Sequence, residues 1–195
     1  MFSTSWRGGV ALVCGAWLGL GLGSHVRAEE ALQEVKAEKL VLNVPSKWKK
    51  QQPTSMLRLA QFEIPAAEGD TGTGELVVFP PFGGTKEQNI KRWIDQFEVK
   101  DRMVKLSQGT ANGSEYLVAE ISGTYRKPIG PPIAQKTEAT PGSRMVAIIV
   151  SVKEAGNYFL KLTGPDKTVT AAAEGLRTSF GAKAETETEY KPAAE

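Results

Sequence analysis

The chain has 195 residues, of which 24% are charged, and a formal net charge of +2 with one cysteine and one histidine. A single cysteine cannot form a disulfide within the chain, so stability must come from packing. The charge lacks the basic excess typical of nucleic-acid-binding proteins, and no such partner is expected.

Residues 1–28 are typical of a cleavable signal peptide. Arg7 precedes an apolar run from Gly8 to Gly23, and Val26 and Ala28 occupy the two positions that a signal peptidase reads. The run is shorter than the roughly 20 apolar residues of a membrane span. We therefore expect an exported protein, periplasmic or extracellular, cleaved after Ala28 and with no stable membrane insertion.

Cleavage would change the inventory of reactive side chains, because Cys14 and His25 lie in the removed segment. Two of the 24 basic residues would leave with it, so the remaining 22 would balance the 22 acidic ones. The mature chain would lack an imidazole base, a thiolate nucleophile and any His or Cys metal ligand. We expect no cofactor and no metal, and no catalytic residue can be named.

The two ends of the mature chain contain few apolar side chains. Residues 29–38 are charged and are predicted to be a linker, and residues 181–195 alternate acidic residues with Thr or Ala and are predicted to be a disordered tail. A single domain is then expected over residues 39–180.

The strand predictions are of two kinds. Four segments mix apolar with polar residues, as half-buried or edge strands do: 40–44, 56–64, 103–108 and 116–125. Two segments, 76–79 and 145–150, are continuously apolar, which indicates central strands buried on both faces. Short hairpin turns are predicted at 112–113 and 154–157, so most pairing should be antiparallel.

Helical periodicity occurs twice. Thr85 and Gln88 have capping-box spacing before an apolar stripe that predicts a helix over 86–98. A second stripe begins at Pro165 and ends before Gly181. Each helix has one apolar face and should pack on the sheet, which predicts an α+β fold with a mostly antiparallel sheet between helices.

The order of these elements resembles the PsbP-like fold. The residues that carry the resemblance are Val44-Pro45-Ser46-Lys47-Trp48 after the opening strand, then Arg58 to Phe62, a mid-chain helix, a hairpin and a final helix. That family includes the extrinsic photosystem subunit, a Ran-binding import factor and small exported bacterial proteins. The resemblance implies an α-β-α sandwich and an accessory or binding role.

The segment 126–143 contains several prolines and is predicted to be a long loop between two strands. Ile129 and Ile133 are apolar residues that such a loop could present to a partner. The alternative is a mobile excursion without function.

Two further places are candidate binding sites. Phe82, Gly83, Gly84 and Thr85 join a buried strand to a helix N-terminus, where free amides could hold an anion, although a turn with an N-cap also explains them. Arg58 shares strand parity with Phe62, so a regular strand would direct its guanidinium into the core, unless the strand starts later or Arg58 lies at the core edge.

The sequence therefore predicts an exported, non-enzymatic accessory or binding protein with an unknown protein or small-molecule partner. Two alternatives stay open: a cofactor-free hydrolase with paired carboxylates, and a carrier with an apolar cavity for a small ligand.

Overall fold

The structure of the chain is a computed structural model that describes residue 1 and residues 31–130 and 136–192. The predicted signal peptide, apart from Met1, lies outside the described residues. Neither helix among these residues has the length and apolar character needed to cross a membrane.

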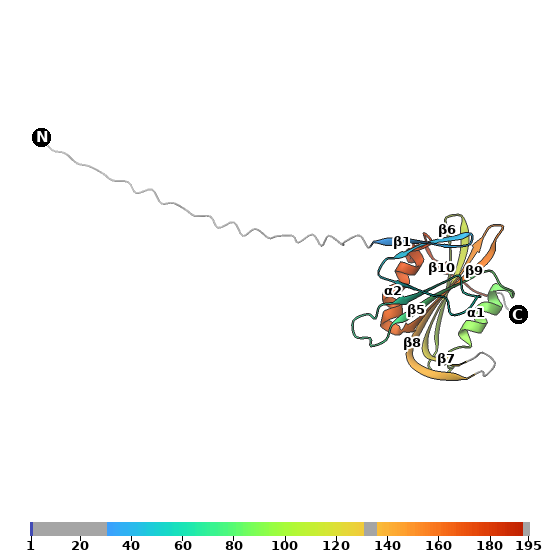
Figure 1. Cartoon of the computed structure of the whole chain (residues 1–195). Helices are drawn as coiled ribbons and strands as arrows, with labels where there is room; N and C mark the ends of the chain where they lie inside the picture. The colour runs from blue at the N-terminus through green and yellow to red at the C-terminus, as the bar shows by residue number, and fades with distance from the viewer. Residues whose placement is uncertain (2–30, 131–135, 193–195) are drawn as a thin grey trace.

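An eight-stranded antiparallel sheet forms the centre of the fold (Figure 1). Its order is β10-β6-β7-β8-β9-β5-β4-β3. The strands are β3 (Lys49–Gln51), β4 (Ala60–Ile64), β5 (Gly74–Phe79), β6 (Met103–Ala111), β7 (Ser114–Pro128), β8 (Thr137–Val152), β9 (Gly156–Pro165) and β10 (Thr188–Glu189).

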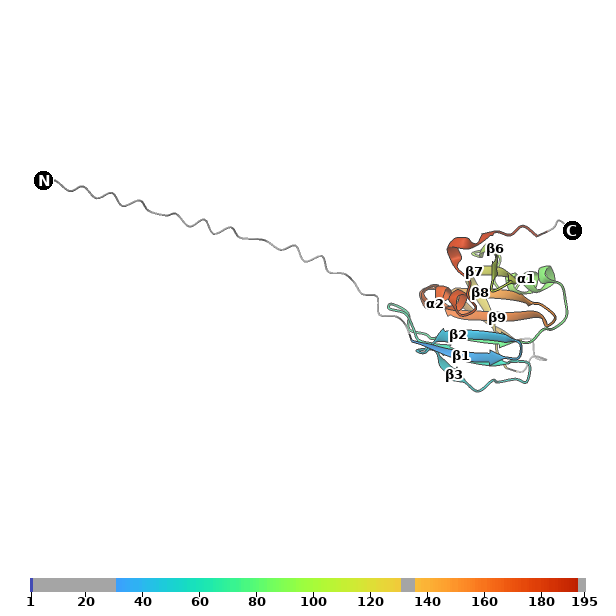
Figure 2. The same ribbon diagram turned by 90° about the horizontal axis from the view of Figure 1, so that it is seen from above.

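The two faces of this sheet are covered differently (Figures 1 and 2). The α2 face packs against α2 (Asp166–Thr178) and against the hairpin of β1 (Leu32–Ala37) and β2 (Leu40–Pro45). The α1 face packs against α1 (Lys86–Ile94). This arrangement confirms the α+β fold and places one helix on each side of the sheet, as the single apolar stripes predict.

Alternation along the strands divides the core into two apolar clusters, because successive side chains point to opposite faces. Val146, Ile148 and Val150 of β8 belong to the α2 face, whereas Met145, Ala147 and Ile149 belong to the α1 face. All six are buried, as predicted for a central strand. The α2 face holds the larger cluster, to which α2, β1 and β2 all contribute.

Local sequence signals account for the turns and helix ends. Thr85 Oγ1 accepts a hydrogen bond from Gln88 N, and Gln88 Oε1 accepts one from Thr85 N, which confirms the predicted capping box. Asn112 and Gly113 both have positive φ, as a two-residue hairpin turn requires. The helix α1 ends at Ile94, earlier than predicted, because residues 96–98 pair with the segment around Tyr125 instead.

The predicted linker at 29–38 is wrong over residues 32–37, which form β1. Val35 and Ala37 are buried against the α2 face, and the strand pairs along its length with β2. The turn between β1 and β2 has Glu38 at a φ of 56°, a conformation for which the segment has no Gly or Asn signal.

The predicted long loop at 126–143 is wrong over most of its length, because β7 and β8 continue as an antiparallel pair to Pro128 and Thr137. The register shifts at Gly123 and Tyr125, where Pro141 and Gly142 of β8 lie opposite Thr124. A proline is tolerated at such a bulge because the ladder there needs no amide donor.

The predicted disordered tail is also wrong for the residues described. After α2 the chain forms the 3₁₀ turn η2 (Ala184–Thr186) and then β10, which pairs with β6 at the edge of the sheet. Tyr190 then donates a hydrogen bond from its hydroxyl to Glu87 Oε1 of α1. The tail therefore follows the sheet edge to the α1 side.

Candidate functional site

A cluster of polar side chains occupies the part of the α1 face that α1 leaves uncovered. The apolar cluster under α1 draws on β6, β7, β8, β9 and Phe79, and within the described residues it includes none from β4. Over β4, β5 and the middle of β9 the same face carries charged or amide side chains around the buried Val77 of β5. We call this set the polar cluster, and it consists of Arg58, Gln61, Glu75, Gln96, Tyr125 and Lys161.

Arg58 enters this cluster from the chain that precedes β4. A turn joins Arg58 N to Ser55 O at 3.0 Å, and the strand begins only at Ala60. Of the two interpretations of Arg58, the structure confirms the one in which the strand starts later, and the predicted direction of its guanidinium into the core is wrong. Its guanidinium Nη1 instead lies 3.2 Å from Glu75 Oε1 and 3.0 Å from Gln61 Oε1.

Gln61 and Glu75 come from neighbouring strands and complete this half of the cluster. Gln61 Nε2 donates to Glu75 Oε1 at 2.8 Å, so one carboxylate oxygen receives both the amide and the guanidinium. The Glu75 side chain is 44% exposed and the Arg58 side chain 25%. This ion pair is thus partly solvated.

Lys161 forms the other half of the cluster. It lies on β9, where its ammonium Nζ donates to Gln96 Oε1 at 2.7 Å and to the Tyr125 hydroxyl at 3.2 Å. Both acceptors are neutral, and no carboxylate of the described residues forms an ion pair with Lys161. Gln96 follows α1 and Tyr125 follows the bulge in β7, so three separate elements converge on this nitrogen.

The surroundings of Lys161 change its acidity. Burial disfavours its charged form and lowers its pKa to about 8; Glu75 opposes this effect and Arg58 adds to it. Burial also raises the pKa of Tyr125 to about 12, and Glu75 acts in the same direction. Near neutral pH, Lys161 therefore loses its proton more readily than an ordinary lysine, whereas the Tyr125 phenol beside it stays protonated.

The segment from Phe82 to Thr85 has a structural role that the fold displays directly. Phe82 stacks on Phe159 with ring centroids 4.2 Å apart, and Thr85 caps α1. Gly84 has a φ of 98°, which favours glycine at this turn. An anion at this helix N-terminus stays a prediction.

Ile129 lies at the described end of the long β7–β8 hairpin. It is 41% exposed, and its amide donates to Lys136 O at 2.9 Å. Ile133 lies outside the described residues. A role for either residue in partner binding stays a prediction.

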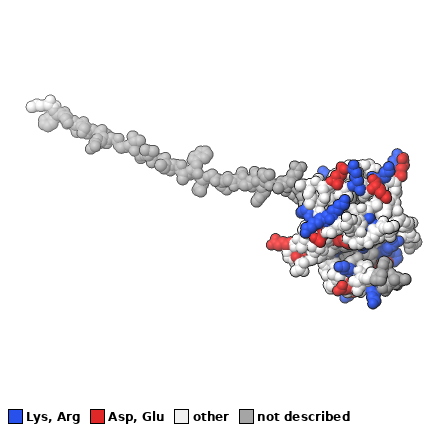
Figure 3. Space-filling view, in the orientation of Figure 1, with Lys and Arg blue, Asp and Glu red and all other residues white. Residues whose placement is uncertain are grey.

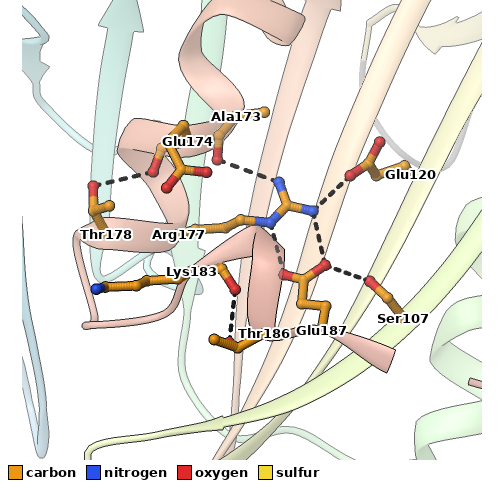
Figure 4. A network of polar contacts seen from close by, with 9 residues as sticks. All are labelled: Ser107, Glu120, Ala173, Glu174, Arg177, Thr178, Lys183, Thr186 and Glu187. Carbon is orange, nitrogen blue, oxygen red and sulfur yellow. Dashed lines mark hydrogen bonds and ion pairs between the residues drawn. The ribbon is translucent and has the colours of Figure 1, made fainter. Parts of the chain in front are cut away.

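A second polar network lies on the α2 face, and it holds the C-terminal segment (Figure 4). Arg177 of α2 is 3% exposed and donates to Glu120 Oε1 at 2.5 Å and to Glu187 Oε1 at 2.7 Å. Ser107 of β6 donates to Glu187 at 2.6 Å. One guanidinium thus binds both carboxylates, which leaves this pair as a structural anchor and not the open acid and base of a hydrolase.

A groove of about 610 Å³ runs beside α2 on the outer side of the fold. Apolar and polar residues line it together, among them Trp48, Ile64, Lys47 and Glu174. This mixed lining does not match the apolar cavity expected of a carrier. The described residues also contain no group of three or more His, Cys, Asp or Glu side chains that could hold a metal ion.

Sequence reasoning selected Arg58 but missed its partners. Lys161 is flanked by Leu160 and Leu162 in an alternating strand, where a lysine is expected to lie on the solvent side. Tyr125 reaches it only because the bulge turns β7, and Gln96 only because α1 ends early. None of these three placements has a local sequence signal.

Comparisons with known proteins find similarity in structure. No protein-family model matches the chain. The comparison with curated protein sequences also finds no match. The structure is similar to the solution structure of cyanobacterial PsbP from Synechocystis sp. PCC 6803, with 15% identity, 87% of this chain and 99% of that chain covered, and a TM-score of 0.43. It is also similar to a protein of unknown function from Pseudomonas aeruginosa, with 10% identity, 73% and 88% coverage, and a TM-score of 0.39.

The first of these structures has the PsbP-like arrangement that the element order predicts. With 15% identity and a TM-score of 0.43, this similarity says nothing about activity or partners.

Proposed function

We propose that this protein is an exported binding protein and that it holds a small polar ligand at the polar cluster. The observation that carries the proposal is the environment of Lys161, a partly buried cation that has only neutral hydrogen-bond partners among the described residues. Burial of a charge without a counter-charge costs stability, and such groups concentrate at functional sites. A ligand that accepts a hydrogen bond from Lys161 would recover part of that cost.

The remaining groups of the cluster suit a small polar molecule. Glu75 and Gln61 offer acceptors and an amide donor, and Arg58 offers further donors beside them. On the side of the molecule shown in Figure 3, positive and negative side chains are interspersed. The polar cluster likewise combines Arg58 and Lys161 with Glu75, and this mixture favours recognition of a small molecule through directed hydrogen bonds over attraction of a highly charged polymer.

Export is the second part of the proposal and rests on the pattern of residues 1–28. The test is the intact mass of the protein isolated from its native host. A mature chain that begins at Glu29 supports export, and a chain that retains residues 1–28 contradicts it.

Binding is tested with propanamide, a small neutral molecule that has a carbonyl acceptor and an amide donor. Chemical shifts of the protein would be followed as the probe is added, and we expect saturable changes at residues 58, 61, 75, 96, 125 and 161. Lys161→Met should abolish them. Lys153→Met, at an exposed turn between β8 and β9, is the matched control and should leave them unchanged. Equal responses from both variants would contradict the proposed site.

A further inference from the structure

The geometry of the polar cluster also points to a chemical reaction. We infer that Lys161 captures small aldehydes as a reversible imine, with Tyr125 as the proton donor and acceptor. The inference rests on the proposed binding at this cluster and names the class of ligand.

The first requirement of imine formation is a neutral amine, because an ammonium has no lone pair for attack on a carbonyl carbon. The structure supplies the condition for one: Lys161 Nζ lies in a partly buried position with an amide oxygen and a phenol as its partners. The charged groups that face it are Glu75 from β5 and Arg58 from the chain before β4, and these are engaged with one another at 3.2 Å. A pKa of about 8 leaves about a tenth of this amine neutral at pH 7, against about 0.03% for an ordinary lysine.

The second requirement is a group that moves protons beside the nitrogen. The Tyr125 hydroxyl is 3.2 Å from Nζ and 3.4 Å from Gln96 Oε1, so the amide oxygen and the amine orient it together. With its pKa raised to about 12 by burial, this phenol is protonated at neutral pH, and its position beside Nζ lets it pass a proton between the nitrogen and a bound oxygen.

The reaction balances without any further reagent. The Lys161 lone pair attacks the aldehyde carbon, the carbonyl π electrons move to oxygen, and Tyr125 transfers a proton from nitrogen to that oxygen to give a carbinolamine. The C–O bond then breaks, the hydroxyl leaves as water with the Tyr125 proton, and the nitrogen lone pair forms the C=N bond. The last nitrogen proton returns to Tyr125, so that an amine and an aldehyde give an imine and water.

The site is suited to capture and less suited to turnover. Hydrolysis of the imine is the reverse of its formation, and the same phenol serves both directions. The cluster has Glu75 as its one carboxylate, and that group is held by Arg58 and Gln61. We therefore assign reversible retention of the aldehyde and no subsequent bond cleavage.

The test uses the full chain with propanal at pH 7 and sodium cyanoborohydride, which reduces an imine to a stable secondary amine. Peptide mass mapping then measures the rate of propylation at each lysine. We expect Lys161 to react about tenfold faster than the exposed Lys153, since partial burial offsets some of the advantage in neutral amine. Lys161→Arg should remove the fast phase, and Lys153→Arg should not.

Tyr125→Phe separates the proton-transfer role from simple packing. We expect it to slow propylation of Lys161 at least tenfold while shifts caused by propanamide at residues 58, 61 and 75 persist. Equal rates at Lys161 and Lys153 in the wild-type protein would overturn the inference. In that case, saturable binding of propanamide would still support the proposed binding function. Equal propylation rates together with no binding of propanamide would contradict both the inference and the proposed function.

Discussion

The two faces of the central sheet differ in the elements that cover them and in the side chains that are buried there. The α2 face is apolar from β7 to β4, and a helix and a hairpin cover it together. The α1 face is apolar under its short helix, whereas over β4, β5 and the middle of β9 polar side chains surround the buried Val77. Neighbouring residues of one strand therefore have opposite roles, as Lys161 and Leu162 of β9 demonstrate.

The two faces also differ in how their charged side chains are paired. On the α2 face the buried Arg177 is paired with two carboxylates, those of Glu120 and Glu187. On the α1 face Lys161 is left with neutral partners. A partly buried cation whose hydrogen-bond partners are all neutral lowers stability, and this is the observation on which the proposed binding site rests.

The largest expected effect is on the α2 face, at Arg177. Arg177→Met leaves Glu120 and Glu187 without their shared partner, with Glu187 only 5% exposed. We expect a loss of about 3–5 kcal/mol in the free energy of unfolding, measured by chemical denaturation. Lys183→Met, an exposed change in the same segment, is the control and should cost less than about 0.5 kcal/mol. Similar small losses for both variants would refute the role of this network as an anchor.

The next prediction compares the loss in the free energy of unfolding for substitutions on the two sides of β9. Leu162 is fully buried on the α2 face, and Leu162→Ala should cost about 2–4 kcal/mol through the cavity that it leaves. Thr163 is the next residue and lies on the α1 face, partly buried. Thr163→Ala should cost less than about 1 kcal/mol. If the two substitutions cost the same, the contrast between the faces does not hold.

Substitution of Lys161 should increase the free energy of unfolding, in contrast to the substitutions of Arg177 and Leu162. Its pKa is lowered from 10.5 to about 8 in the folded protein, so between these pH values the unfolded chain binds more protons and stability rises with pH. Lys161→Met removes the buried charge and should raise the free energy of unfolding at pH 7 by about 1–3 kcal/mol.

The pH dependence provides the check on this prediction. The difference between wild type and Lys161→Met should shrink from pH 8 to 10.5 as the folded wild-type protein loses its proton. A difference that is constant over this range would show that the gain comes from packing of the methionine and not from the charge.

Sequence patterns predicted those parts of the fold that depend on neighbouring residues. The capping box, the Asn112-Gly113 turn and the continuously apolar strand at 145–150 are local, and all three are confirmed. Residues 188–189 were missed because they pair with β6, about 80 positions earlier in the chain. Residues 32–37 pair with the adjacent β2, but the turn at Glu38 has no Gly or Asn signal, and β1 is buried only through Val35 and Ala37 on the α2 face. A charged segment with two buried apolar residues gains its stability from such pairing and not from its own composition.

The site was harder to predict than the fold for the same reason. Arg58 was selected because it is a cation within a mostly apolar segment. Its partner Glu75 lies 17 residues away, on β5, and no local pattern connects the two. The contact between Lys161 and Tyr125 depends on a register shift at Gly123, where a side chain would meet Asp101 O at 2.9 Å. Only the folded chain shows that a bulge on β7 supplies the phenol beside an amine on β9.

The smallest expected effect concerns the helix that covers part of the α1 face. Thr85→Ala removes the acceptor for Gln88 N and half of the capping box, and it should cost about 1 kcal/mol in the free energy of unfolding. Thr85→Ser keeps the hydroxyl and is the matched control, with an expected loss below about 0.5 kcal/mol. Because Gln96 follows α1 and holds Lys161, loosening of the helix should also weaken propanamide binding slightly. An alanine variant as stable as the serine variant would mean that packing of Ile90 and Trp93 alone positions α1, and that the cap contributes nothing to the geometry at Lys161.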